Sequence, residues 1–203
     1  YGISKPASLD LKLMDFISRN IAANTPEMYE AHFGVPMAGC VLNTINTRLE
    51  AETIAYILAD SDSRLLIADT AFRETVLAAL DMLDHDIEVI DIRDAALGDL
   101  PALGKMDYES FIAAGAPDYD WQLPQDEWQA LTLSYTSGTS GRPKGVVYHH
   151  RGAYLLAQGN ALTTSMGKHA VYLWTLPMFH CNGWCFPWTL SAITGTHVCL
   201  RQV

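Results

Sequence analysis

The chain has 203 residues, 49% of them hydrophobic, which is enough for a sizeable buried core in one or two compact units. Acidic residues outnumber basic ones by 23 to 13, and the net charge of -10 argues against general binding to the phosphate backbone of nucleic acid. Four scattered cysteines, no signal peptide and no apolar run long enough to span a bilayer predict a globular protein of a reducing, cytoplasmic compartment, and not a secreted disulfide scaffold.

Residues 1–92 are expected to alternate between strands and helices. The first 23 residues are the least informative. Apolar side chains at helical spacing (Leu9, Leu13, Phe16 and Ile17) indicate a short helix, and residues 21–23 are a possible strand remnant. The expected elements that follow are helices over 25–39, 50–60 and 72–83 and strands over 40–42, 65–68 and 87–92. This alternation predicts an α/β fold, a layered α/β/α arrangement with a mostly parallel sheet.

Residues 93–126 lose this periodicity and are expected to form a long surface excursion with a short helix over 108–114. Its aromatic residues are expected to fix the loop to the core, the alternative being a ligand-binding box: Tyr108, Phe111, Tyr119 and Trp121. Structure then resumes, with strands expected over 131–135, 145–148, 171–176 and 196–200, helices over 149–162 and 183–193, and a turn over 177–182.

The loop between the strands at 131–135 and 145–148 has the composition of a polyphosphate cradle. It combines hydroxyl groups, glycines and cations in a short run: Thr136, Ser137, Gly138, Thr139, Ser140, Gly141, Arg142 and Lys144. Glycines let backbone N–H groups face an anion, hydroxyls add hydrogen bonds, and lysine supplies a point charge. It is not a Walker A loop, because Lys144 precedes Gly145 instead of Ser or Thr. The alternative is a mobile, polar surface loop.

A second candidate segment follows the strand at 171–176. His180 comes after Pro177, where side chains of α/β sheets reach the crevice beyond the strand ends, although it could also be a histidine packed beside Phe179. From spacing alone, a core position is favoured over a ligand contact for Trp184 on its apolar helix. Zinc binding by His180 with the nearby cysteines is disfavoured because no second ligand pair has suitable spacing.

Two further possibilities near these segments are weighed from the residues alone. Cys181 as a nucleophile is disfavoured because no base and orienting carboxylate can be assigned as its partners. His149, His150 and Arg151 lie at an expected helix start, where cations oppose the helix dipole. A solvated cap is slightly preferred there over support of the neighbouring phosphate loop.

Residues 135–146 (Tyr-Thr-Ser-Gly-Thr-Ser-Gly-Arg-Pro-Lys-Gly-Val) resemble the phosphate-loop signature of the adenylate-forming superfamily. Ser140 stands where Thr is usual and keeps the hydroxyl. Residues 176–187 (Leu-Pro-Met-Phe-His-Cys-Asn-Gly-Trp-Cys-Phe-Pro) resemble its acyl-CoA synthetase branch, the fatty-acid and short- to medium-chain acid ligases. Residues 24–27, Gly39 and 42–49 also match this branch. The resemblance covers residues 24–203, and residues 1–23 match poorly.

The resemblance implies that residues 24–203 are an incomplete AMP-binding N-terminal domain, without the C-terminal lid domain. It implies ATP-dependent activation of a carboxylic acid to an acyl-adenylate, which coenzyme A then captures as acyl-CoA. Residues 136–141 and Lys144 would bind the phosphates, Thr139 would lie beside Mg²⁺, and His180 and Trp184 would line the acid site. Lys144 and His180 are the expected catalytic residues. The expected partner is a small-molecule carboxylic acid, and a homodimer is one open arrangement.

Two classes of function remain after this comparison. The preferred one is an acyl-CoA synthetase, and the rival is a non-catalytic nucleotide-binding fragment or an adenylation module that loads a carrier protein. The acidic magnesium ligand, the ribose-binding aspartate and the catalytic lysine of the mobile domain that the family supplies are not among these residues. The chain alone is therefore expected not to turn over substrate.

Overall fold

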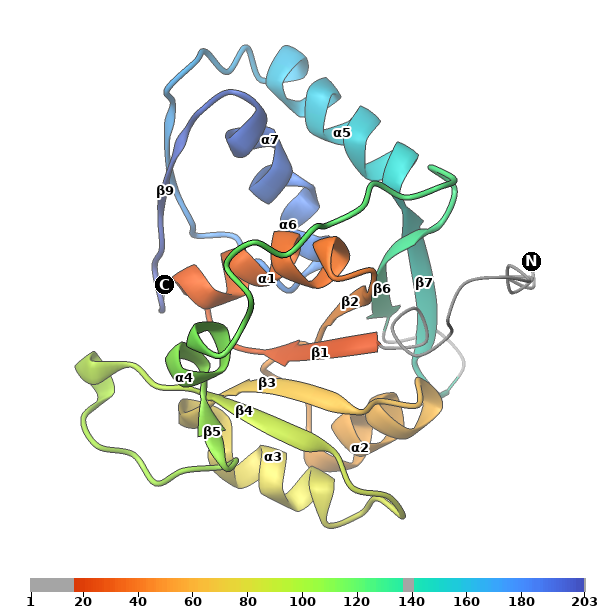
Figure 1. The fold of residues 1–203 in the computed structure, drawn as a ribbon, viewed down its shortest axis with the longest axis vertical. Helices are drawn as coiled ribbons and strands as arrows, with labels where there is room; N and C mark the ends of the chain where they lie inside the picture. Colours follow the sequence, from red (N-terminus) through yellow and green to blue (C-terminus); the bar gives the residue numbers. More distant parts are fainter. Residues whose placement is uncertain (1–16, 137–140, 203) are drawn as a thin grey trace.

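The computed structural model describes residues 17–136 and 141–202, which form a layered α/β structure (Figure 1). Its main sheet has seven strands in the order β5-β4-β3-β1-β2-β6-β7. They are β1 (Ile17–Ile21), β2 (Val41–Thr44), β3 (Leu65–Asp69), β4 (Glu88–Ile92), β5 (Met106–Asp107), β6 (Ala130–Thr136) and β7 (Lys144–His149). All neighbours pair in parallel except β6 and β7, which form an antiparallel hairpin. The expected mostly parallel α/β architecture is confirmed.

Helices cover both faces of this sheet (Figure 1). They are α1 (Pro26–Met37), α2 (Ala51–Asp60), α3 (Arg73–Leu80), α4 (Tyr108–Ala113), α5 (His150–Thr163), α6 (Cys181–Trp184) and α7 (Phe186–Ala192), with 3-10 turns η1 (Thr70–Phe72) and η2 (Ala95–Leu97). A small parallel sheet joins β8 (Val171–Leu173) to β9 (Thr196–Val198). Figure 1 shows α2 and α3 on one side of the main sheet and α1 and α7 on the other. None of the helices in the described ranges has the length and apolarity needed to cross a membrane.

The core lies on both faces of the main sheet because neighbouring residues of a strand point to opposite sides. Leu66 packs with Ile54 and Val76 under α2 and α3, whereas Ile67 packs with Met28 and Trp174 on the other face. The continuous apolar run of β3 thus fills two layers at once. This is the pattern expected of a parallel strand that is covered on both sides.

The first strand differs from what the sequence pattern predicts. Ile17, expected in a short helix, begins β1, and Ile21, expected in a strand remnant, ends it. The strand lies between β2 and β3. Leu9, Leu13 and Phe16 lie outside the described residues. The sheet therefore includes residues before Asn24, where the resemblance begins.

Polar side chains occupy the middle of the sheet. Arg19 and Asn20 on β1 and Asn43 on β2 are at most 1% exposed. The Nη2 group of Arg19 donates to the carbonyl of Ser61 at 3.1 Å, but within the described ranges Nε and Nη1 have no hydrogen-bond partner. Burial lowers the pKa of Arg19 to about 9, because the charged guanidinium group is less stable in this position than in water.

The later elements depart from expectation at three points. β8 ends at Leu173, earlier than predicted, and the predicted helix over 183–193 begins only at Phe186. The excursion contributes the unexpected edge strand β5. Among its aromatic residues Tyr108 is buried and donates to Glu30, as expected. Trp121 is half-exposed and lines a hollow with Phe33 and Trp188, whereas Phe111 and Tyr119 are at least 38% exposed.

His32 on α1 makes stability depend on pH. Its ring is fully buried, Nδ1 donates to the carbonyl of Met28 at 2.7 Å, and burial lowers its pKa to about 4. The unfolded chain binds a proton near pH 6.5 that the folded protein does not, so stability is lost as pH falls from about 6.5 to about 4. We expect His32→Gln to remove about 3 kcal/mol of this loss. Urea unfolding of the wild-type and His32→Gln proteins between pH 6.5 and pH 4 measures the difference. An equal loss of unfolding free energy in both proteins would contradict the prediction.

Candidate functional site

The β6–β7 hairpin carries both ends of the predicted phosphate loop. Thr136 at the end of β6 pairs with Lys144 at the start of β7, and the Thr136 hydroxyl donates to the Lys144 carbonyl at 3.5 Å. Both side chains are exposed, as is Gly141. Gly141 has a φ of +125°, a backbone conformation that residues other than glycine rarely adopt. The expected mounting of the loop between two strands is confirmed, and its lysine and first hydroxyl are accessible to a ligand.

The four central residues of the predicted cradle, Ser137, Gly138, Thr139 and Ser140, lie outside the described residues. Their contacts with phosphate, and the place of Thr139 beside a metal ion, stay predictions. The structure describes the two strand ends that the loop connects.

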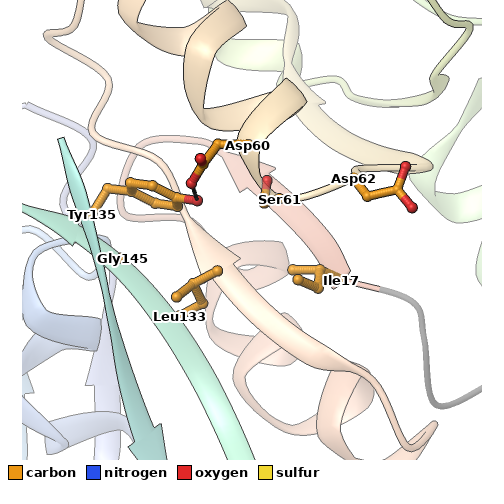
Figure 2. Close-up of a pocket in the computed structure, with 7 residues that line it drawn as sticks. All are labelled: Ile17, Asp60, Ser61, Asp62, Leu133, Tyr135 and Gly145. Atoms are coloured by element: carbon orange, nitrogen blue, oxygen red, sulfur yellow. Dashed lines mark hydrogen bonds between the residues drawn. The ribbon is translucent and has the colours of Figure 1, made fainter. Parts of the chain in front are cut away.

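One face of the hairpin borders an open hollow of about 560 Å³ (Figure 2). Leu133 and Tyr135 of β6 line it together with Asp60 and Asp62 at the end of α2. The Tyr135 hydroxyl donates to Asp60 Oδ2 at 2.7 Å, and burial followed by this bond raises the pKa of the phenol. Two carboxylates would repel a polyphosphate. The hollow is therefore unsuited to the nucleotide phosphates.

The opposite face of β6 supports the second candidate segment. It crosses the carboxyl ends of the parallel strands, where ligands of α/β sheets bind. Asn24, which follows β1 and directly precedes Thr25, the cap of α1, fixes the start of this segment. Its Nδ2 donates to the carbonyls of Trp174 and Leu176 at 2.9 and 3.1 Å, and its Oδ1 accepts from the Met178 N–H at 2.8 Å. A buried side chain thus replaces the missing strand hydrogen bonds beyond β8.

The segment then forms a left-handed turn, which comprises α6 and Cys185. Its five consecutive residues have φ values between +45° and +62°: Cys181, Asn182, Gly183, Trp184 and Cys185. This conformation costs about 1–2 kcal/mol for each residue other than glycine. At Gly183 a side chain would also meet the ring of Trp174, because a Cβ atom there would lie 3.0 Å from it. Such a turn needs compensating contacts.

Asn182 supplies those contacts from a fully buried side chain. Its Oδ1 accepts hydrogen bonds from the hydroxyls of Thr132 and Ser134 on β6, at 2.8 and 2.7 Å. Its Nδ2 donates to the Thr44 hydroxyl at the end of β2 at 3.1 Å, and that hydroxyl donates to the Phe179 carbonyl at 2.8 Å. Sequence reasoning missed these residues, although Asn-Gly at 182–183 is a turn signal.

His180 and Trp184 lie at the two ends of this turn, and both are exposed. His180 Nε2 is 4.0 Å from the Cys181 sulfur, and Trp184 is 51% exposed, with its carbonyl accepting from Asn160 at 2.8 Å. Trp184 therefore does not belong to the core that the described residues form. Asn182, which lies between them in the chain, bonds to Thr132 and Ser134 of β6, and Ser134 is two residues before Thr136.

The remaining candidates near the turn have other roles. Burial raises the pKa of the Cys185 thiol to about 12, which keeps it protonated. In residues 17–136 and 141–202 no group of three His, Cys, Asp or Glu side chains could hold a metal ion. His149 caps α5, since its Nδ1 accepts from the Gly152 N–H at 2.9 Å, so the preferred cap role is confirmed.

The chain is similar to several known proteins. Residues 21–203 match the family model described as AMP-binding enzyme. The chain is 50% identical to acetate/butyrate–CoA ligase, peroxisomal, from Arabidopsis thaliana over 90% of this chain and 34% of the relative. It is 43% identical to benzoate–CoA ligase, peroxisomal, from the same plant over 97% of this chain and 35% of the relative.

A structural likeness agrees with the sequence matches. The fatty acyl CoA synthetase of Mycobacterium tuberculosis superposes with a TM-score of 0.71 and 25% identity, over 93% of this chain and 35% of that one. The chain thus spans about a third of the length of the curated relatives that it matches.

Proposed function

Because the chain belongs to the AMP-binding enzyme family, we propose that it forms the phosphate-loop and acid-binding part of an acid–CoA ligase. The whole enzyme would activate a carboxylic acid with ATP, release pyrophosphate, and transfer the acyl group to coenzyme A. The 203-residue chain alone would bind substrate groups without turning them over.

One observation carries this proposal. The hairpin that holds the two ends of the phosphate loop also holds, through Asn182, the turn that presents His180 and Trp184. A site for a polyphosphate therefore adjoins a site with an exposed imidazole and indole. A reaction between a carboxylate and the α-phosphate of ATP needs its two substrates placed in this way.

The side chains have distinct proposed roles. Lys144 and residues 136–141 would bind the β- and γ-phosphates and favour departure of pyrophosphate. His180 would contact the carboxylate that is activated, and Trp184 would border the acyl group. The phosphate contacts proposed for residues 137–140 rest on the sequence, because these residues lie outside the described ranges.

Mg²⁺ is part of the proposal through its usual chemistry. It binds phosphate and water oxygens and takes few protein ligands. The exposed hydroxyl of Thr136 is of the oxygen type that Mg²⁺ prefers, and Thr139 is the ligand proposed from the sequence. Bound Mg²⁺ would neutralise phosphate charge, while Lys144 would add its own positive charge beside it.

The proposed substrate is a short-chain monocarboxylic acid, of the kind named for the relative with 50% identity, with an aromatic acid as the second choice. A fatty acid of longer chain is the third. The cytoplasmic location expected from the cysteine pattern stays a proposal, because both of these relatives are peroxisomal by name.

The test uses the full-length protein that carries this chain. We expect acid-dependent exchange of pyrophosphate into ATP, and formation of AMP and acyl-CoA when coenzyme A is added. The acids to compare are acetate, butyrate, benzoate and palmitate, and the highest kcat/KM is expected for acetate or butyrate. The isolated 203-residue chain is the control and should give neither signal.

The same assay separates the rival functions. Exchange that coenzyme A does not convert to a thioester would indicate an adenylation module that loads a carrier protein. ATP binding without exchange for any acid would indicate a nucleotide-binding protein. Either result would overturn the proposed ligase.

A further inference from the structure

We propose that Asn182 is a positioning residue for the acid substrate, holding the left-handed turn so that His180 and Trp184 keep a fixed place relative to the phosphate hairpin. This inference rests on the proposed function for its substrate, but its geometric part concerns only the described residues. Asn182 itself is fully buried and does not reach the substrate.

The first step of the argument is the backbone of the turn. Asparagine tolerates the left-handed region better than most residues, and Asn182 adopts φ +45° and ψ +53°. The neighbouring residues Cys181 and Trp184 have no such tolerance, yet both have positive φ values. Backbone hydrogen bonds within the turn run from Gly183 N–H to the His180 carbonyl at 2.9 Å and from Cys185 N–H to the Asn182 carbonyl at 3.2 Å.

The second step is the direction of the side-chain bonds. Thr132 and Ser134 lie two residues apart on β6, so their hydroxyls project from the same face and converge on a single oxygen. Thr44 approaches the amide nitrogen from β2. Every polar atom of the Asn182 side chain thus bonds to a strand of the main sheet. The centre of the turn is therefore anchored to the main sheet.

The third step connects this anchor to the acid site. Thr44 bonds to the carbonyl of Phe179, the residue before His180, while Asn160 of α5 bonds to the carbonyl of Trp184. Both ends of the turn are held from outside, and Asn182 holds its centre. Loss of the amide would leave the hydroxyls of Thr132 and Ser134 without this acceptor and free the strained backbone to relax. Exposed side chains at both ends would then move together.

The experiment compares Asn182→Ala and Asn182→Gly with the wild-type full-length protein. Glycine keeps the left-handed freedom and loses the side-chain bonds, whereas alanine loses both. We expect kcat/KM for the acid to fall by about 10-fold for Asn182→Gly and by about 100-fold for Asn182→Ala. The KM for ATP should change by less than about threefold, because residues of the hairpin stay paired.

Thr132 offers a matched pair that avoids changing the turn itself. Thr132→Val keeps the size of the side chain and removes the donor, and Thr132→Ser keeps the donor. We expect the loss in kcat/KM for the acid to appear with valine and to be rescued with serine. Val76→Ala, a core change under α3 on the opposite face of the sheet, controls for lowered stability and should leave both KM values unchanged.

Hydrogen exchange separates this inference from the proposed function. The amides of Gly183 and Cys185 should exchange at least about 10-fold faster in Asn182→Gly than in wild type, whether or not the protein is a ligase. Unchanged exchange, or equal losses in KM for acid and ATP, would overturn the positioning role. Faster exchange in a protein whose wild type lacks acid-dependent activity would overturn the proposed function and with it the acid-positioning role, leaving only the structural anchor.

Discussion

Lys144→Ala in the full-length protein is expected to lower the rate of acid-dependent ATP–pyrophosphate exchange by at least about 100-fold. The lysine begins β7, opposite Thr136, and its side chain is exposed at the mouth of the loop. Without it, the phosphates lose a charge-assisted hydrogen bond that should strengthen as negative charge builds on the departing pyrophosphate.

Two controls make this result specific. Lys144→Arg keeps the charge but changes its shape, so part of the activity should survive. Lys105→Ala removes another exposed lysine, beside β5 at the opposite edge of the seven-stranded sheet, and should leave exchange unchanged. Wild-type exchange in Lys144→Ala would refute the phosphate-binding role of this residue.

Arg19→Leu is expected to raise the free energy of unfolding by about 2 kcal/mol or more. Arg19 is fully buried in the central strand β1, and only its Nη2 group has a hydrogen-bond partner among the described residues. Leucine would replace a poorly compensated charge with an apolar side chain beside Leu66 and Ile57 of the same core layer. The cost is the lost bond to Ser61, which is smaller than that of burying the charge.

Chemical denaturation of the 203-residue chain measures this change, with Arg64→Leu as the control. Arg64 has a side chain that is 51% exposed and pairs only with Asp62 in the described part of the chain, so its replacement should shift stability by no more than about 0.5 kcal/mol. A lower stability of Arg19→Leu would show that the bond to Ser61 outweighs the burial of the guanidinium group.

The fold could be predicted where burial leaves a regular pattern. β3 is a continuous apolar run because helices cover both of its faces, and α1 begins where Thr25 and Pro26 give a cap and a first turn. Only Ile21, the last residue of β1, was expected in a strand, since Arg19 and Asn20 interrupt the apolar pattern before it. Its place in the sheet is decided by pairing with β2 and β3, which local sequence does not contain.

The candidate site shows the same division. The hydroxyls and glycines of the phosphate loop are contiguous, so their composition alone indicated a polyphosphate. The turn at Asn182 is stabilised by partners 48, 50 and 138 residues away, and no spacing rule relates such distant positions. Its non-helical backbone also explains why the predicted helix over 183–193 begins late.

The alternating faces of β6 make this strand sensitive to insertions and deletions. Even-numbered positions Thr132 and Ser134 hold Asn182, while odd-numbered Leu133 and Tyr135 face the hollow beside α2. Inserting or deleting a single residue in this strand would exchange the two sets and place hydrophobic groups against the buried amide. In related sequences, insertions and deletions should therefore occur in the surface excursion at 93–126 and be absent from β6, even where β6 tolerates point substitutions.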